Sequence, residues 1–181
     1  MQGLSEHDHV IYVGTFSKVL FPSLRIGYMV VPADLIDQFS AMREASDIYP
    51  PTLSQTVLTE FIKQGAFARH LRRMRSVYSE RLQVLVECVH RELAGRAQIE
   101  IADSGLHVVL FLSEEVVDTA VCEQAARHGV IVMPLSTCYQ STPVRKSLIL
   151  GFGGTDSTQI RRGVLSLARA LDTVARQSRS M

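Results

Sequence analysis

Lys18 follows two hydroxyl residues and precedes an arginine within a short stretch near the start of the chain. Ser17 comes directly before it, Thr15 three residues before it, and Arg25 follows seven residues later. A lysine amine forms an imine with an aldehyde when its surroundings disfavour the charged form. Hydroxyls, backbone N–H groups and a guanidinium are the groups that hold a phosphate. The stretch therefore predicts a site for an aldehyde that carries a phosphate.

Lysine is rare in this chain, which uses arginine for nearly all of its positive charge. There are sixteen arginines and three lysines, which are Lys18, Lys63 and Lys146. A lysine among the apolar residues Phe16, Val19 and Leu20 is unusual against that background. The bias alone raises interest in Lys18 without assigning it a role.

The string T-F-S-K-V-L-F-P-S-L-R-I-G-Y resembles the cofactor-lysine signature of the fold-type I, class I/II aminotransferases. The signature has the form S/T-x-S-K-x-x-x-P-x-x-R-x-G, and the chain matches it at Thr15, Ser17, Lys18, Pro22, Arg25 and Gly27. The resemblance implies that Lys18 binds pyridoxal 5'-phosphate as a Schiff base. It also implies that Thr15, Ser17 and Arg25 bind the cofactor's phosphate.

Three segments resemble one branch of these proteins, the MocR group of GntR-type transcription regulators. They are residues 10–18, residues 70–81 with the run H-L-R-R-M-R, and residues 148–152. In that group an aminotransferase-like domain follows a winged helix-turn-helix. The resemblance runs from about residue 2 to residue 176 and implies the C-terminal part of such a protein. This part would be an effector module that lacks both the DNA-binding domain and the upstream half of the cofactor site.

The resemblance also implies partners and leaves other functions open. The implied ligands are pyridoxal phosphate and a small amine or amino acid, the implied assembly is a homodimer, and DNA would be bound only through the missing N-terminal domain. The alternative is a class I/II aminotransferase that transfers an amino group between an amino acid and a 2-oxo acid. A third interpretation is a truncated remnant without cofactor that contributes to dimer packing.

The chain departs from the family pattern in two places. The family supplies an acid at the pyridine nitrogen, a stacked aromatic residue and a glycine-rich phosphate loop from sequence before the lysine, and that sequence is missing here. We therefore expect no catalysis by residues 1–181 alone, because electron withdrawal by the ring needs the acid. Ile149 stands where many aminotransferases carry the carboxylate-binding arginine of an R-x-x-F pattern that ends here at Phe152. An isoleucine cannot bind a carboxylate, which suits a sensor.

The hydrophobic pattern predicts an α/β protein, and the resemblance implies the C-terminal portion of the pyridoxal-phosphate-dependent transferase fold. We expect a partial large domain over residues 1–66, a long linking helix over 67–95 and a small α/β lobe with a mixed sheet over 96–181. Strands are expected at 10–13, 26–31, 99–101, 108–112, 130–133 and 148–150, and helices at 33–45, 54–65, 67–93, 115–128 and 157–175. The short β-branched run at 10–13 is expected to be buried on both faces.

The composition restricts the class of protein and the cellular compartment that we expect. The net charge is +1 and 46% of residues are apolar, so the overall balance indicates an ordinary globular protein with no membrane or nucleic-acid signal of its own. Three scattered cysteines argue against a disulfide framework or a zinc site. With no signal peptide in the first residues, we expect a cytoplasmic protein.

Five further features have a functional and a plainer interpretation. For His107 at a strand edge we favour a structural hydrogen bond over ligand contact, and for Tyr49 a packed loop position over cofactor contact. The cluster His7-Asp8-His9 is more simply a polar terminus than a metal site, and the Ser17–Lys18 pair is not expected to act as a hydrolase dyad because adjacent residues point apart. The run G-F-G-G at 151–154 is expected to be a turn rather than a phosphate loop.

Arginines crowd one part of the long helix predicted at 67–93. They are Arg69, Arg72, Arg73, Arg75 and Arg81. A solvated helix face is the favoured interpretation, and a basic patch for a partner is the alternative.

Overall fold

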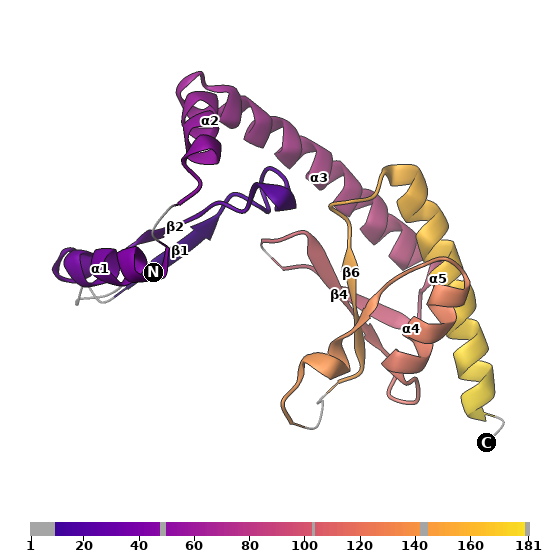
Figure 1. The fold of residues 1–181 in the computed structure, drawn as a ribbon. Helices are drawn as coiled ribbons and strands as arrows, with labels where there is room; N and C mark the ends of the chain where they lie inside the picture. Colours follow the sequence, from indigo (N-terminus) through magenta and orange to yellow (C-terminus); the bar gives the residue numbers. More distant parts are fainter. Residues whose placement is uncertain (1–9, 48–49, 103, 142–144, 180–181) are drawn as a thin grey trace. The chain divides into compact units, whose positions relative to one another are not determined.

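The computed structural model describes residues 10–47, 50–102, 104–141 and 145–179 (Figure 1). The chain divides into two compact units, Met1–Arg73 and Met74–Met181. The long helix α3 (Ala66–Glu92) continues through this division. In the described part of the chain, no helix combines the length and the apolarity that crossing a membrane requires.

The first unit is built around a two-stranded antiparallel hairpin. Strand β1 (Tyr12–Thr15) pairs with β2 (Gly27–Val30) so that Tyr12 faces Val30 and Thr15 faces Gly27. A short 3-10 helix, Pro22–Leu24, lies in the loop between the strands. The predicted strands at 10–13 and 26–31 are therefore present, the first displaced by two residues.

Helices follow the hairpin in the first unit. A 3-10 turn (Ala33–Leu35) leads into α1 (Ile36–Ser46), and after Pro50 and Pro51 the chain forms α2 (Thr52–Lys63). Gly65, with φ of 69°, takes the left-handed conformation that ends a helix before α3 begins. These helices occupy the positions that the periodicity predicts.

The prediction that the first strand is buried on both faces is wrong for the described structure. Tyr12 is 54% exposed and Val13 is 68% exposed, and every residue of β2 is exposed. Side chains of a strand point to the two faces of its sheet, so their exposure means that the described residues do not cover both faces of this two-stranded sheet. The β-branched run is nevertheless typical of a strand that packs on both faces in a larger sheet.

The second unit contains a four-stranded sheet with the order β3-β4-β6-β5. Its strands are β3 (Ala97–Glu100), β4 (His107–Leu112), β5 (Met133–Pro134) and β6 (Ser147–Gly151). Helix α4 (Asp118–Arg127) connects β4 to β5, a 3-10 helix (Leu135–Cys138) follows β5, and α5 (Ser157–Arg179) ends the described chain.

The sheet is antiparallel throughout, so the prediction of a mixed sheet is wrong. Each neighbouring pair, β3 with β4, β4 with β6 and β6 with β5, runs antiparallel. Strands β4 and β5 run in the same direction because both oppose β6, but β6 lies between them. The sequence shows a β-α-β order that suggests a parallel pair, and it contains no signal that a third strand inserts between the two.

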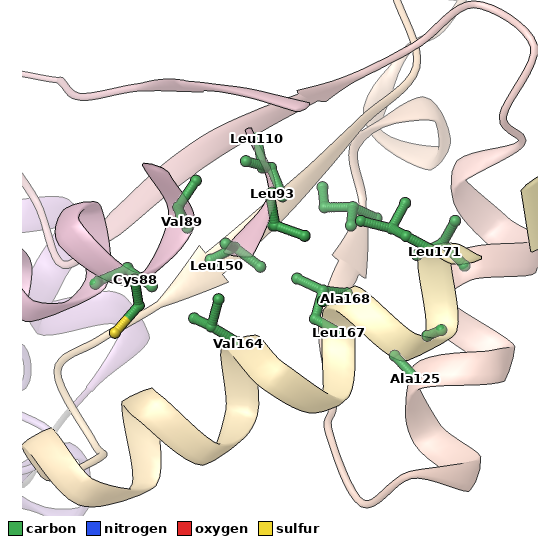
Figure 2. Packing of buried hydrophobic residues seen from close by; sticks show 14 of the residues in the cluster. Cys88, Val89, Leu93, Leu110, Ala125, Leu150, Val164, Leu167, Ala168 and Leu171 are labelled. Carbon is green, nitrogen blue, oxygen red and sulfur yellow. The ribbon is translucent and has the colours of Figure 1, made fainter. Parts of the chain in front are cut away.

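One apolar core holds the second unit together. Figure 2 shows side chains of α3, β4, β6, α4 and α5 that point toward one another, and Leu93, Leu110, Leu148 and Ala125 are fully buried. Burying a leucine side chain contributes about 1.5–3 kcal/mol each. Alternate residues of β6, Leu148 and Leu150, face this core, which is the period-2 pattern of a sheet with one face covered.

The arginines of α3 have different environments. Arg69, Arg72, Arg73 and Arg75 are exposed, whereas Arg81 is half-buried and donates a hydrogen bond to the carbonyl oxygen of Gly153 at 2.6 Å. The four exposed arginines fit both a solvated helix face and a basic patch for a partner. Arg81 instead has a structural contact within the second unit.

Candidate functional site

Two glycines allow the hairpin strands to approach closely where the signature begins and ends. A Cβ on Gly14 would lie 2.4 Å from the ring of Tyr28, its partner on β2, because that ring lies across the glycine. A Cβ on Gly27 would lie 3.0 Å from the carbonyl oxygen of Gly14. A side chain at Gly27 would therefore press on the backbone of β1, and the ring of Tyr28 leaves no room for one at Gly14. A hydrogen bond with Tyr12 also raises the pKa of Tyr28.

Lys18 lies in a turn directly after β1. The amides of Val19 and Leu20 both donate to the carbonyl oxygen of Phe16, at 3.2 and 2.9 Å. The amide of Ser17 donates to Thr15 Oγ1 at 3.1 Å, which fixes the entry to the turn. Lys18 is exposed there, and its side chain makes no hydrogen bond or ion pair with another described residue.

Arg25 lies at the opposite end of the loop that closes the hairpin. Pro22 begins the 3-10 helix, and Arg25 follows it with φ of 49° and ψ of 38°, a left-handed conformation that costs a residue other than glycine about 1–2 kcal/mol. The loop ends meet because the carbonyl oxygen of Ile26, beside Arg25, accepts hydrogen bonds from Phe16 N at 3.0 Å and Thr15 Oγ1 at 3.4 Å. A strained arginine at such a position points to a functional side chain.

Thr15 is the last residue of β1, Ser17 and Lys18 follow it at the start of the loop between β1 and β2, and Arg25 lies near the end of that loop. Arg25 also lines an open depression of about 620 Å³, together with Phe16 and residues of α1, and Lys18 is not part of that lining. The Arg25 guanidinium has no hydrogen bond or ion pair with the residues described in the structure.

The donor set of this loop fits an aldehyde that bears a phosphate. Ser17 provides a hydroxyl and Arg25 a guanidinium, the donor types that bind a phosphate dianion, and Lys18 provides an accessible amine. Thr15 is partly engaged, because its hydroxyl hydrogen points to the Ile26 carbonyl oxygen at 3.4 Å and its oxygen accepts from Ser17 N. Its contact with a phosphate would need that long hydrogen bond to be exchanged.

An aromatic cluster and one histidine support the lysine turn from α2 and α3. The ring of Phe16 lies 5.7 Å from that of Phe67, which in turn lies 6.4 Å from Phe61. His70 Nε2 lies 2.8 Å from the carbonyl oxygen of Val19. The sequence alone did not reveal this role for His70, since 51 residues separate it from its partner and no local pattern relates the two.

Ile149 lies on the sheet face opposite the covered core face of the second unit. It pairs with Val109 on β4 and with Met133 on β5, so its surroundings on that face are apolar. His107 is exposed at the start of β4 and its ring lies beside Gly151, where an added Cβ would be 3.3 Å from His107 Cδ2. The structure therefore places no guanidinium at position 149 or at its cross-strand neighbours.

The run at 151–154 begins with the last residue of β6 and continues into a turn at Gly153 and Gly154, which agrees with the predicted turn. Phe152 is buried and its amide donates to the Leu106 carbonyl oxygen at 3.0 Å, while Arg81 binds the Gly153 carbonyl oxygen. These contacts are those of a packed turn. Two of the weighed features, Tyr49 and the His7-Asp8-His9 cluster, lie outside the described residues. Within the described ranges no group of His, Cys, Asp or Glu is arranged to hold a metal ion.

Comparison with known proteins gives a family match over most of the chain. The model of the family "Aminotransferase class I and II" matches residues 1–164. The probable rhizopine catabolism regulatory protein MocR of Rhizobium meliloti is 42% identical over 170 residues, which are 94% of this chain and 34% of that protein. The uncharacterized HTH-type transcriptional regulator YdeL of Bacillus subtilis is 39% identical over 173 residues, 94% of this chain and 37% of the regulator.

A solved structure agrees with the sequence relatives. LysN, the alpha-aminoadipate aminotransferase of Thermus thermophilus, was crystallised with N-(5'-phosphopyridoxyl)-L-leucine and superposes with a TM-score of 0.87 at 26% identity. The match covers 97% of this chain and 45% of LysN. The chain spans about a third of the length of the regulators and under half of the enzyme. With its signature loop, its fold and this match, the chain belongs to the class I and II aminotransferase family.

Proposed function

We propose that this chain is the pyridoxal-phosphate-binding, aminotransferase-like effector module of a MocR/GntR-type transcription regulator. The observation that carries the proposal is the loop between β1 and β2. It presents the exposed Lys18 amine, the Ser17 hydroxyl and the Arg25 guanidinium, and no described residue engages the Lys18 or Arg25 side chain. The similarity to HTH-type regulators over 94% of the chain supports the regulatory assignment.

Each residue of the loop has a distinct part in this proposal. When bound, the cofactor supplies an aldehyde and a conjugated ring that accepts electrons. Lys18 would hold the cofactor through its amine, at the aldehyde carbon, with the aldehyde oxygen released as water. Arg25 and Ser17 bind the phosphate, with Thr15 holding the turn and exchanging its hydrogen bond to the Ile26 carbonyl oxygen when it contacts the phosphate.

Trapping the imine tests the proposal directly. The intact protein is incubated with pyridoxal phosphate, reduced with borohydride, digested and mapped by mass spectrometry. We expect the reduced adduct on Lys18, because the chain offers only two other lysines and Lys63 already pairs with Glu60 at 3.6 Å. Lys18→Ala should lose the adduct and the visible imine absorbance, while Lys63→Ala, the matched control, should keep both. An undiminished visible band in Lys18→Ala would refute the assignment.

The ligand is proposed to be a small amine or amino acid that does not rely on a guanidinium at position 149. Ile149 lies among Val109 and Met133, which offer no partner to a carboxylate. The alternative function is a class I/II aminotransferase, which the similarity to LysN favours. Incubating the intact protein with pyridoxal phosphate, amino acids and 2-oxo acids separates the two. Sustained multiple turnover would favour the enzyme. A single spectral change without turnover would favour the sensor.

The proposal extends to assembly and location. We propose a homodimer, which sedimentation of the intact protein would reveal, and DNA contact through a helix-turn-helix domain outside this chain. The three cysteines are free, which accords with a reducing cytoplasmic compartment.

A further inference from the structure

His70 connects helix α3 to the turn that carries Lys18. Its Nε2 atom lies 2.8 Å from the carbonyl oxygen of Val19, the residue directly after the lysine. A carbonyl oxygen only accepts hydrogen bonds, so Nε2 must carry the hydrogen and donate it. The contact is half-buried, and it bridges 51 residues of sequence within the first unit.

The turn has few internal hydrogen bonds to hold its shape. Both of its backbone hydrogen bonds end on the same acceptor, the Phe16 carbonyl oxygen. The Val19 carbonyl lies at the far side of the turn, and His70 is its partner. Without the imidazole, the peptide that carries the Val19 carbonyl would keep only the hydrogen bond from the Leu20 amide to the Phe16 carbonyl oxygen, and the direction of the Lys18 amine would be held less firmly.

The same face of α3 contacts both sides of the turn. Phe67 and His70 are three residues apart and therefore neighbours on one helix face. The ring of Phe67 lies edge-on against Phe16, before the lysine, while His70 binds Val19, after it. The helix thus holds the two residues that bracket Ser17 and Lys18.

We propose that His70 is a positioning residue for Lys18: its hydrogen bond to the Val19 carbonyl oxygen, with Phe67 against Phe16, fixes the turn that presents the amine. The inference rests on the proposed function, because it concerns the lysine that forms the imine. His70 itself contacts no reacting atom. Its effect is on the orientation and mobility of its neighbour.

The test compares four forms of the intact protein, namely wild type, His70→Ala, His70→Gln and His90→Ala. A glutamine amide nitrogen reaches about as far as Nε2 and can donate to the same carbonyl, so it should rescue. His90 is exposed on the same helix and serves as the matched control. The first readout is the rate at which pyridoxal phosphate is trapped on Lys18 by borohydride. The second is amide hydrogen exchange of residues 17–20 without any cofactor.

We expect His70→Ala to slow trapping roughly threefold to tenfold, the factor that one net hydrogen bond of about 1 kcal/mol can supply. Exchange at residues 17–20 should accelerate by a similar factor, while the far-ultraviolet circular dichroism and the exchange of α5 stay unchanged. His70→Gln should return both readouts to within about twofold of wild type, and His90→Ala should match wild type.

Each outcome bears on one of the two proposals. If wild type forms the adduct on Lys18 and His70→Ala traps it at the same rate, the positioning role is wrong and the proposed function stands. If His70→Gln traps the cofactor as slowly as His70→Ala, the inference fails. It also fails if the loss of trapping rate in both variants follows a loss of helix content, because the histidine is then structural only. If wild type itself forms no adduct, the proposed function fails, and the positioning role fails with it.

Discussion

Thiol chemistry differs sharply among the three cysteines, although all lie in the second unit. Cys88 is fully buried, Cys122 is half-buried on α4, and Cys138 is exposed. Burial raises the pKa of the Cys122 thiol to about 11, and the nearby carboxylates of Asp118 and Glu123 add to the effect. A cysteine reacts as the thiolate, so the pKa of Cys122 makes it a poor nucleophile.

We predict that iodoacetamide at pH 8 labels Cys138 and leaves Cys122 largely unmodified. With a pKa of about 11, about one Cys122 thiol in a thousand is ionised at pH 8. Labelling of Cys122 should rise as the pH approaches 11, and peptide mapping measures each site separately. Cys88 is an internal control for intact folding, because it should stay unlabelled in the native state. Faster labelling of Cys122 than of Cys138 at pH 8 would contradict the prediction.

The same pKa makes stability depend on pH in a defined direction. The folded state keeps a proton on Cys122 that an unfolded chain, with a cysteine pKa of about 8.5, gives up. The stability that this group contributes is therefore present below about pH 8.5 and is lost as the pH rises toward 11. Cys122→Ala should remove this part of the alkaline decline of the urea midpoint.

At the scale of elements, Asp118 joins three segments of the second unit. It is the first residue of α4 and is 98% buried, since only 2% of its surface is exposed. Its carboxylate accepts from Thr119 N at 2.9 Å and from Ser136, through Oγ at 2.8 Å and N at 3.0 Å. The amide of Ser147 on β6 lies 3.5 Å away. The negative charge also complements the N-terminus of α4.

We predict that Asp118→Ala lowers the free energy of unfolding by about 2–4 kcal/mol, because it leaves several buried donors without an acceptor. Urea denaturation followed by circular dichroism measures the change, with an unchanged slope as the sign that cooperativity is preserved. Glu123→Ala, an exposed carboxylate on the same helix, is the matched control and should cost less than about 0.5 kcal/mol. Equal midpoints for the two variants would show that the Asp118 network is not stabilising.

The local sequence predicted most helices and strands, because the spacing of apolar residues and the residues that end each element were clear. The apolar spacing predicted helices at 67–93 and 157–175, and the structure has Ala66–Glu92 and Ser157–Arg179. Asp156 and Gln159 cap α5 reciprocally, at 2.8 and 2.9 Å, which is a local signal. The predicted mixed sheet failed because strand order depends on tertiary pairing. No local pattern indicates that β6 lies between β4 and β5.

In the candidate site too, residues of one local motif could be predicted from the sequence, and residues brought together by the fold could not. Thr15, Ser17, Lys18 and Arg25 lie within eleven residues, so one motif could predict them together. The structure adds how the loop ends meet, at the Ile26 carbonyl oxygen. His70 and Phe67 could not be predicted, because contacts between distant segments are absent from a single sequence. Their roles follow from the fold and not from spacing.

At the scale of the whole molecule, burial is distributed unequally between the two units. Every member of the main apolar core lies between Val84 and Val174. Among the described residues before position 74, only Pro32 and Leu58 are buried. Large apolar side chains of the first unit, such as Val13, Met42 and Leu53, are exposed instead. Because stability follows buried apolar area, the two units should differ in their resistance to opening.

We predict strong amide protection in the second unit and weak protection in the first for the 181-residue chain. Hydrogen exchange followed by mass spectrometry should show the core peptides of β4, β6 and α5 exchanging slowest. Peptides of β1, β2 and α1 should exchange orders of magnitude faster, since few buried contacts oppose their opening. Leu148→Ala should accelerate only the second unit, by removing a fully buried side chain. Equal protection across both units would contradict the prediction.

The left-handed backbone at Arg25 sets stability and ligand binding against each other. A glycine would occupy that conformation without steric cost but would carry no guanidinium to the phosphate. Selection for binding therefore keeps an arginine that selection for folding alone would replace. Among related sequences, those that have lost the ligand should be free to drift toward glycine or asparagine at this position, while the rest of the hairpin persists. The residue at position 25 would then distinguish descendants that still bind a phosphate from descendants that keep only the fold.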